Sequence, residues 1–350
     1  MPKTSALAVL VLAASTQTLA QDLKQTIVGC VELECPPSSK DTANDNCTIA
    51  DTGSFPYVGL TRISSNSSSP LSSLSWVKGV NITSSSTSTV PRTFHSSFFL
   101  GAPPTLSVNA SSSATGACAV FLRGAEAWDM AFGEEVVKET AQGTCADAMG
   151  VSCVDALVGR AKERIEGYYG GSGDVPASNA DACERLRRDL LNSTLDACMA
   201  VSRGSWTNFT AVALTGNDGP EPISQRENSS TTCWPITPKK DSLSLVAEFT
   251  QVGSDLVADA EKAFWAITPI LTIFFPIGNG TATDTIDASL SCVKAMGPAR
   301  ASVDTMNNGT DDQDNGVISL LSSNLSATVI SKSSTVEVVS PLGSNPQFAE

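Results

Sequence analysis

The segment Cys145–Cys198, CADAMGVSCVDALVGRAKERIEGYYGGSGDVPASNADACERLRRDLLNSTLDAC, decides the fold class of this chain. Apolar residues recur in it at spacings of three and four, which predicts helices. The glycine-rich break 168–174 separates two such runs. Cys145 and Cys153 fall on the first run, and Cys183 and Cys198 on the second. We therefore expect a helical hairpin braced by disulfides.

Three details of this hairpin can be compared with a structure. Gly150 is the weak point of the first helix and is expected to kink or split it. The second helix is expected to begin near Asn179 or Asp181, because either side chain can cap a helix. Arg187 falls within the apolar arc of the second helix, and the pattern gives no reason for it.

Strand-like sequence lies on both sides of the hairpin. Alternating or β-branched runs predict strands at 26–35, 74–82, 93–100 and 117–122 before it, and at 243–249, 267–277 and 288–294 after it. The run 254–265 predicts an amphipathic helix, and the very apolar run 267–277 is too short to span a bilayer. The expected fold class is α+β. It has an antiparallel β-rich portion, with strands from both the N- and C-terminal thirds, and an inserted disulfide-braced helical hairpin.

The ends of the chain differ in composition from this central part. Residues 1–20 have the pattern of a secretory signal peptide, with Lys3, an apolar core at 6–14, and a small residue before the cleavage point at Gln21. Residues 21–300 are expected to form a single disulfide-rich α+β domain, with the helical insert at about 125–205. Residues 301–350 are rich in Ser, Thr and Asn and are expected to be mostly disordered. The tail lacks the apolar end that a lipid-anchor signal needs.

The cysteines and the glycosylation sequons agree with an extracellular location. Ten cysteines allow five structural bridges: Cys30, Cys35, Cys47, Cys118, Cys145, Cys153, Cys183, Cys198, Cys233 and Cys292. Their connectivity stays open, apart from a suggested local Cys30–Cys35 bridge with Cys47 pairing farther away. Ten Asn-X-Ser/Thr sequons occur, and their occupancy is open: Asn46, Asn66, Asn81, Asn109, Asn192, Asn208, Asn228, Asn279, Asn308 and Asn324.

The net charge and the absence of known motifs argue against several kinds of partner and catalytic site. A net charge of −14 argues against nucleic acid as a partner. His95 is the sole histidine, no Gly-X-Ser-X-Gly elbow accompanies it, and it is interpreted as structural. The sequence has neither a Cys-X-X-Cys motif nor a phosphate-binding loop, so no cofactor and no metal are expected. A calcium loop beginning at Asp311 would place Ser322 where a bidentate glutamate is required.

Paired carboxylates are the one enzymatic constellation that the sequence leaves open. Glu126, Asp129, Glu134 and Glu135 lie near Trp128, which could stack on a sugar, so they are weak candidates for a two-carboxylate glycosidase. The alternative is a helix start, where acidic side chains are favoured by the positive end of the helix dipole. If the chain has a site, we expect it where this acidic entrance to the helical block meets the flanking strands.

Several short motifs also carry a resemblance. They are Phe98–Pro104, Gly116–Phe121, Gly143–Cys145, Cys233–Pro235 and Ile267–Pro269. Over about residues 25–300 the chain resembles uncharacterised cysteine-rich secreted glycoproteins of filamentous fungi. That resemblance implies a source and a secreted location, and it implies no activity.

The sequence therefore predicts a secreted, N-glycosylated extracellular or cell-wall-associated protein, which acts as a non-catalytic binding or structural module. Candidate partners are cell-wall polysaccharide or another extracellular protein. Two alternatives are retained: a two-carboxylate glycoside hydrolase, and a cofactor-free enzyme of the secretory pathway that acts on an apolar small molecule. A deep apolar pocket would favour the last of these. The ligand, the substrate and the oligomeric state are not predicted.

Overall fold

The computed structural model describes residues 26–30, 33, 47–49, 53–55, 57–63, 73–83, 92–106, 108, 115–123, 130–133, 137–170, 175–193, 195–202, 208–223, 234–253, 256–277 and 286–297. All of them belong to one unit of the chain, Met1–Gly309. The expected signal peptide and C-terminal tail lie outside the described residues. The fold is mixed α+β, with antiparallel sheets and disulfide-bonded helices, as the sequence predicts.

The first sheet has the strand order β3-β4-β5-β8, and every neighbouring pair is antiparallel. Its strands are β3 (Tyr57–Arg62), β4 (Ser75–Thr83), β5 (Arg92–Ala102) and β8 (Ser242–Gly253). The last three confirm predicted strands, whereas β3 was not predicted. The predicted strand at 26–35 is wrong where it is described: Val28 makes only an isolated bridge to Leu60.

The second sheet has the order β10-β9-β6-β7 and is also antiparallel throughout. Its strands are β6 (Thr115–Arg123), β7 (Asn208–Ala213), β9 (Thr268–Pro276) and β10 (Asp287–Val293). The predicted runs 117–122, 267–277 and 288–294 are confirmed, and β7 was not predicted. A separate small hairpin consists of β1 (Cys47–Ile49) and β2 (Gly53–Phe55).

Alternation along β6 joins two cores. Ala117, Ala119 and Phe121 pack against the first sheet, where the Phe121 ring meets Phe98 edge-on at a centroid distance of 5.2 Å. Cys118, Val120 and Leu122 point the other way and pack against helices. Successive strand side chains face opposite sides, so a strand that is apolar at every position is buried on both faces. The second sheet is therefore the central layer, with helices on one side and the first sheet on the other.

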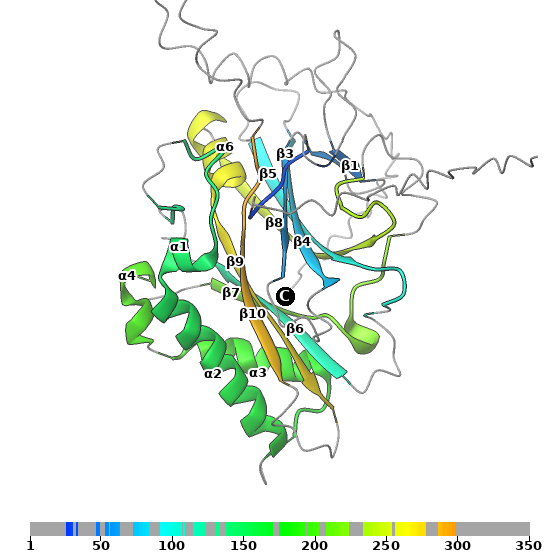
Figure 1. Cartoon of the computed structure of the whole chain (residues 1–350), viewed down its shortest axis with the longest axis vertical. Coiled ribbons are helices and arrows are strands. Elements are labelled where there is room, and N and C mark those ends of the chain that lie inside the picture. Colours follow the sequence, from blue (N-terminus) through cyan, green and yellow to red (C-terminus); the bar gives the residue numbers. More distant parts are fainter. Residues whose placement is uncertain are drawn as a thin grey trace, which may run out of the picture. The chain divides into compact units, whose positions relative to one another are not determined.

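The helical insert lies between the neighbouring strands β6 and β7. It contains α1 (Cys145–Met149), α2 (Val151–Gly170), α3 (Asn179–Leu191), the 3-10 turn η3 (Asp196–Cys198) and α4 (Met199–Ser202). Figure 1 shows α1 and α2 beside β9 and β10, on the side away from β3 and β4. Gly150 has a φ of +82°, which L side chains rarely adopt, and it separates α1 from α2. The expected split at this residue is confirmed.

The structure corrects the expected cap and the expected end of the second helix, and it explains the position of Arg187. The cap is Ser178, whose Oγ accepts from the Asp181 backbone N–H at 3.2 Å, and Asn179 is the first helical residue. The helix ends at Leu191, so Cys198 belongs to η3 instead. Arg187 donates to the Glu184 carboxylate at 2.6 and 2.8 Å, which explains an arginine at that position.

Four disulfides join described cysteines: Cys30–Cys47, Cys118–Cys183, Cys145–Cys292 and Cys153–Cys198. The suggested Cys30–Cys35 bridge is wrong, because Cys30 pairs with Cys47. Cys35 and Cys233 lie outside the described residues. Two of the bridges tie α3 to β6 and α1 to β10, and a third ties α2 to η3. The first two of these bridges attach the insert to the second sheet. Helix α2 contacts α3 by a hydrogen bond instead, in which the Tyr168 hydroxyl donates to Asp189 at 2.7 Å.

Candidate functional site

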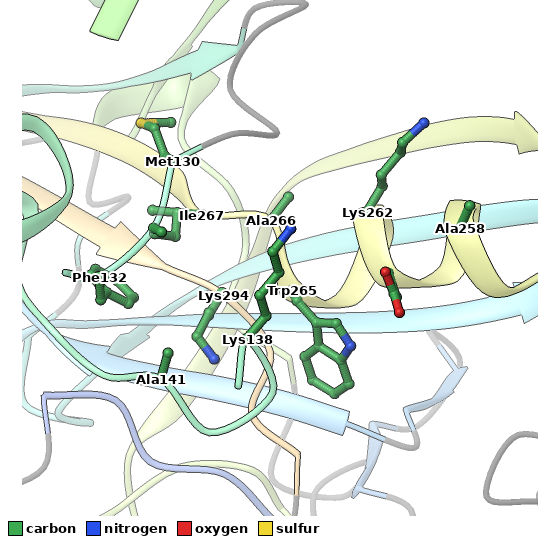
Figure 2. Close-up of a pocket in the computed structure, with 12 residues that line it drawn as sticks. Met130, Phe132, Lys138, Ala141, Ala258, Lys262, Trp265, Ala266, Ile267 and Lys294 are labelled. Carbon is green, nitrogen blue, oxygen red and sulfur yellow. The ribbon is translucent and has the colours of Figure 1, made fainter. Parts of the chain in front are cut away.

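A cavity of about 170 Å³ lies between residues 130–132 and 138–141, helix α6 (Leu256–Trp265) and the residue after β10, Lys294. Its wall is partly apolar, and the described residues that line it also include three lysines and one glutamate. Figure 2 shows Lys138, Lys294 and Trp265 in the middle of the lining, with Met130 and Ile267 towards one end. The structure therefore has a small concave site in which amines and apolar side chains meet.

Helix α6 supplies one wall of the cavity because it is amphipathic, as the sequence predicts. Ala260, Ala263 and Phe264 are buried against Val80 and Phe94 of the first sheet. The opposite face, at positions spaced by three and four, turns Ala258, Glu261, Lys262 and Trp265 towards the cavity. The Ala295 backbone N–H donates to the Phe264 carbonyl at 3.0 Å and holds the end of α6 against β10.

Lys294 follows β10 and forms the buried part of the lining. Only 1% of it is exposed, and its Nζ donates to the carbonyl oxygens of Glu139 at 3.0 Å and Ala295 at 3.4 Å. The Gly297 backbone N–H donates to the same Glu139 oxygen at 3.1 Å. Since buried charges are tolerated only with such partners, these bonds both satisfy the ammonium and fix the 137–141 segment in place.

A second buried lysine lies behind the cavity. Lys78 of β4 is 2% exposed, and its Nζ donates to the carbonyl oxygen of Ala266 at 3.0 Å, directly after α6. Burial lowers the pKa of Lys78 from 10.5 to about 7, with further lowering from the positive charges of Lys294 and Arg123. An amine with this pKa changes its charge near neutral pH.

The only histidine takes part in a different group, on the exposed end of the first sheet. Its Nε2 lies 3.0 Å from Thr83 Oγ1 and its Nδ1 lies 3.4 Å from Glu248 Oε1, while Ser97 Oγ donates to Glu248 Oε2 at 3.2 Å. The order hydroxyl, imidazole, carboxylate is that of a nucleophile with its base. However, the donor and acceptor roles in the Thr83–His95 contact depend on the imidazole tautomer, and Thr83 Oγ1 also donates to the Thr93 carbonyl oxygen at 3.5 Å, across the pairing of β4 with β5. The contacts favour a structural bridge between β4, β5 and β8.

The four acidic candidates cannot be placed. Glu126, Asp129, Glu134 and Glu135 lie outside the described residues, so the two-carboxylate hypothesis stays a prediction. Their neighbours in the sequence, Met130–Phe132 and Lys138, line the cavity. The cavity therefore borders the entrance to the helical block where the sequence suggested looking for a site.

Sequence reasoning missed the two buried lysines, although a signal for one of them exists. Trp76, Lys78 and Val80 occupy alternate positions of β4 and so share one face of the strand. A lysine between two large apolar residues on one face predicts burial. Lys294 gives no such signal, because it follows its strand and is buried by segments distant in the sequence.

Three further findings bear on function. No helix in the described part of the chain is long and apolar enough to cross a membrane. Within the described ranges, no three His, Cys, Asp or Glu side chains gather as a metal site would require. Comparisons with protein-family models, with curated proteins and with solved structures found no match. The resemblance to secreted fungal glycoproteins therefore stays a prediction.

Proposed function

We propose that this protein is a secreted, N-glycosylated binding module that holds a small molecule in the cavity beside α6. The cavity carries the proposal, because it joins apolar walls to a few polar groups, as small-molecule sites commonly do. Its volume of about 170 Å³ favours a compact ligand over a polysaccharide chain. Four disulfides among the described cysteines support an oxidising, extracellular location.

The binding function is tested by thermal shift of the full chain with compact acids, amides, alcohols and amines of six to ten heavy atoms. At a concentration of about 100 Kd a ligand stabilises the folded state by about 2.7 kcal/mol, which raises the melting temperature. The variant Ala258→Phe fills the cavity from the α6 side and is expected to abolish each shift. If no compound raises the melting temperature, or if Ala258→Phe binds as well as wild type, this function is wrong.

The location is tested by expressing the full chain in a eukaryotic secretory host. We expect the medium to contain a protein that begins at Gln21 and loses mass with an N-glycan-removing enzyme. Asn192 and Asn208 are exposed, so both can accept a glycan. A protein that stays inside the cell, unprocessed and without glycan, would contradict secretion and leave cavity binding to be judged by its own test.

A further inference from the structure

We infer that the cavity takes a small apolar carboxylate, a molecule of about the size of benzoate or hexanoate whose acid group meets the lysines of the lining. The inference rests on the proposed binding function and adds the chemical class of the ligand. It follows from the cavity's size, from its apolar walls and from the balance of charge around it.

Size and lining set the apolar part of the ligand. Phe132 and Ile267 are buried, and Met130 and Trp265 are half-buried. An apolar cavity of about 150 Å³ holds benzene, and this one measures about 170 Å³. A six-carbon ring or chain with one polar group therefore fits, and burying it removes apolar surface from water on both sides.

Charge sets the polar part. The whole chain has a formal net charge of −14, but the described residues of this lining include three lysines, Lys138, Lys262 and Lys294, and one carboxylate, that of Glu261. Lys78 adds a fourth amine immediately behind Ala266. Lys138 and Lys262 are exposed, so their ammonium groups can reach a ligand. Lys294 remains hydrogen-bonded to the carbonyl oxygens of Glu139 and Ala295, and its charge acts on the ligand from the buried wall of the cavity.

The end of α6 opposes an anion less than a helix end whose carbonyl oxygens are all free. A helix C-terminus carries partial negative charge on its free carbonyl oxygens. In this protein the Phe264 oxygen accepts from Ala295 and the Ala266 oxygen accepts from the Lys78 amine. Among the described lining residues the amines outnumber the carboxylate, so an anionic ligand is favoured over a ligand amine.

The test measures equilibrium binding to the full chain by titration calorimetry, using benzoate, hexanoate, benzamide and benzylamine. Benzoate is expected to bind about tenfold tighter than the neutral benzamide, since one hydrogen bond to a charged group contributes about 1.5 kcal/mol or more. Hexanoate is expected to compete with benzoate, and benzylamine is expected not to bind. Raising salt from 0.05 to 0.5 M is expected to weaken benzoate and leave benzamide unchanged.

Single variants locate the charge effect. Lys138→Gln and Lys262→Gln are each expected to weaken benzoate by about two- to fivefold and to leave benzamide unchanged. Lys240→Gln is the matched control, because Lys240 is an exposed lysine outside the cavity, and it is expected to change neither affinity. All three substitutions are at exposed positions, so folding is expected to be retained, which circular dichroism of each variant checks.

The outcomes separate the ligand class from the binding function. If benzamide binds as tightly as benzoate, or if Lys138→Gln and Lys262→Gln leave benzoate unchanged, the carboxylate inference is overturned while cavity binding stands. If benzylamine binds best, the charge argument is wrong. If none of the four compounds binds, and the thermal-shift panel is also negative, the proposed function fails together with the inference.

Discussion

Lys78 and Lys294 show how a residue that is normally solvated can belong to the interior. Both ammonium groups donate to backbone carbonyl oxygens, at Ala266 and at Glu139, and both lie 5.8 Å from an aromatic ring centroid, that of Phe98 and of Trp265 respectively. A buried ammonium is tolerated through such contacts but still disfavours its charged form. Lys78 shows this penalty as its lowered pKa.

The lowered pKa of Lys78 gives a pH dependence of stability with a definite sign. The unfolded amine titrates near 10.5 and the folded amine near 7. Between these values the unfolded state holds more protons, so stability rises with pH, and below 7 the full penalty remains. Lys78→Met removes the penalty, so its gain over wild type is expected to shrink by about 2–3 kcal/mol between pH 6.5 and pH 9.

Urea unfolding of both proteins at several pH values measures that difference directly. The carbonyl left without its donor at Ala266 costs the same at every pH and cancels in the comparison. Lys240→Met, at an exposed position, is expected to show a pH-independent difference from wild type. A gain for Lys78→Met that stays constant from pH 6.5 to pH 9 would contradict the titration of Lys78.

Gly59 lies opposite Lys78 in the sheet and cannot carry a side chain. A Cβ there would overlap the carbonyl oxygen of Lys294 and lie 3.2 Å from Ile27 Cγ2. Because this obstacle is backbone, Gly59→Ala is expected to lower the free energy of unfolding by about 3 kcal/mol or more. Chemical denaturation checks the value.

Replacing a second glycine with alanine is expected to have the opposite effect on the free energy of unfolding. Gly159 is an exposed position within α2, and a Cβ there meets no atom within 4 Å. Gly159→Ala is expected to raise the free energy of unfolding by about 0.5–1 kcal/mol. Equal effects of the two substitutions would show that the close approach of β3 to Lys294 is incorrect.

At the level of elements, the positions of the helices were easier to predict than the elements to which their disulfides join them. The spacing of Leu157, Ala161 and Ile165 predicts α2, and Gly150 predicts its separation from α1. The end of α3 was misplaced, because Cys198 was assigned to the same helix as Cys183 although the helix stops at Leu191. A cysteine pattern also cannot tell a bridge between two helices from a bridge between a helix and a strand.

The Cys118–Cys183 bridge makes an element-level prediction. It ties α3 to β6 across 65 residues, for which chain entropy predicts a contribution of about 4 kcal/mol. In the double variant Cys118→Ala/Cys183→Ala we expect this loss of stability, and faster amide exchange in α3 than in α6. The matched control is Cys153→Ala/Cys198→Ala, which frees η3 from α2 and is expected to leave the exchange of α3 less affected. Equal exchange of α3 in both variants would contradict its fastening to the sheet.

At the level of the whole molecule, the continuous apolar character of β6 and β9 predicts the layers but not the strand order. Mostly apolar runs indicate strands covered on both faces, and Ala117–Leu122 and Ile270–Phe275 are buried at every position. The neighbours in the sheet come from opposite ends of the chain, since Thr115 faces Pro276 and Cys118 faces Ile273. Local sequence patterns carry no information about such distant pairing. The cavity could not be predicted either, because its three walls meet only after the sheets assemble.

Because the central sheet contributes to both cores, the insert and the sheets are expected to unfold together. Far-ultraviolet circular dichroism follows the helices. Tryptophan fluorescence reports on the chain's five tryptophans, which include Trp76, buried between the sheets with its indole N–H donating to Thr272 at 3.0 Å. With the disulfides intact, the two signals are expected to change at the same urea concentration. An earlier loss of the helical signal alone would show that the insert unfolds by itself.

The bridge between α1 and β10 has a consequence for the order of events during synthesis. Its two cysteines are 147 residues apart, so at roughly 5–20 residues per second Cys145 leaves the ribosome roughly 7–30 s before Cys292. In that interval Cys183 and Cys198 emerge, so the bridges Cys118–Cys183 and Cys153–Cys198 can form. Cys145 can form only non-native disulfides until Cys292 emerges. A nascent chain cut short before β10 keeps this thiol exposed to exchange. A Cys145 without its bridge is thus expected to mark a chain whose synthesis has not reached β10, and the bridge can form once Cys292 has emerged.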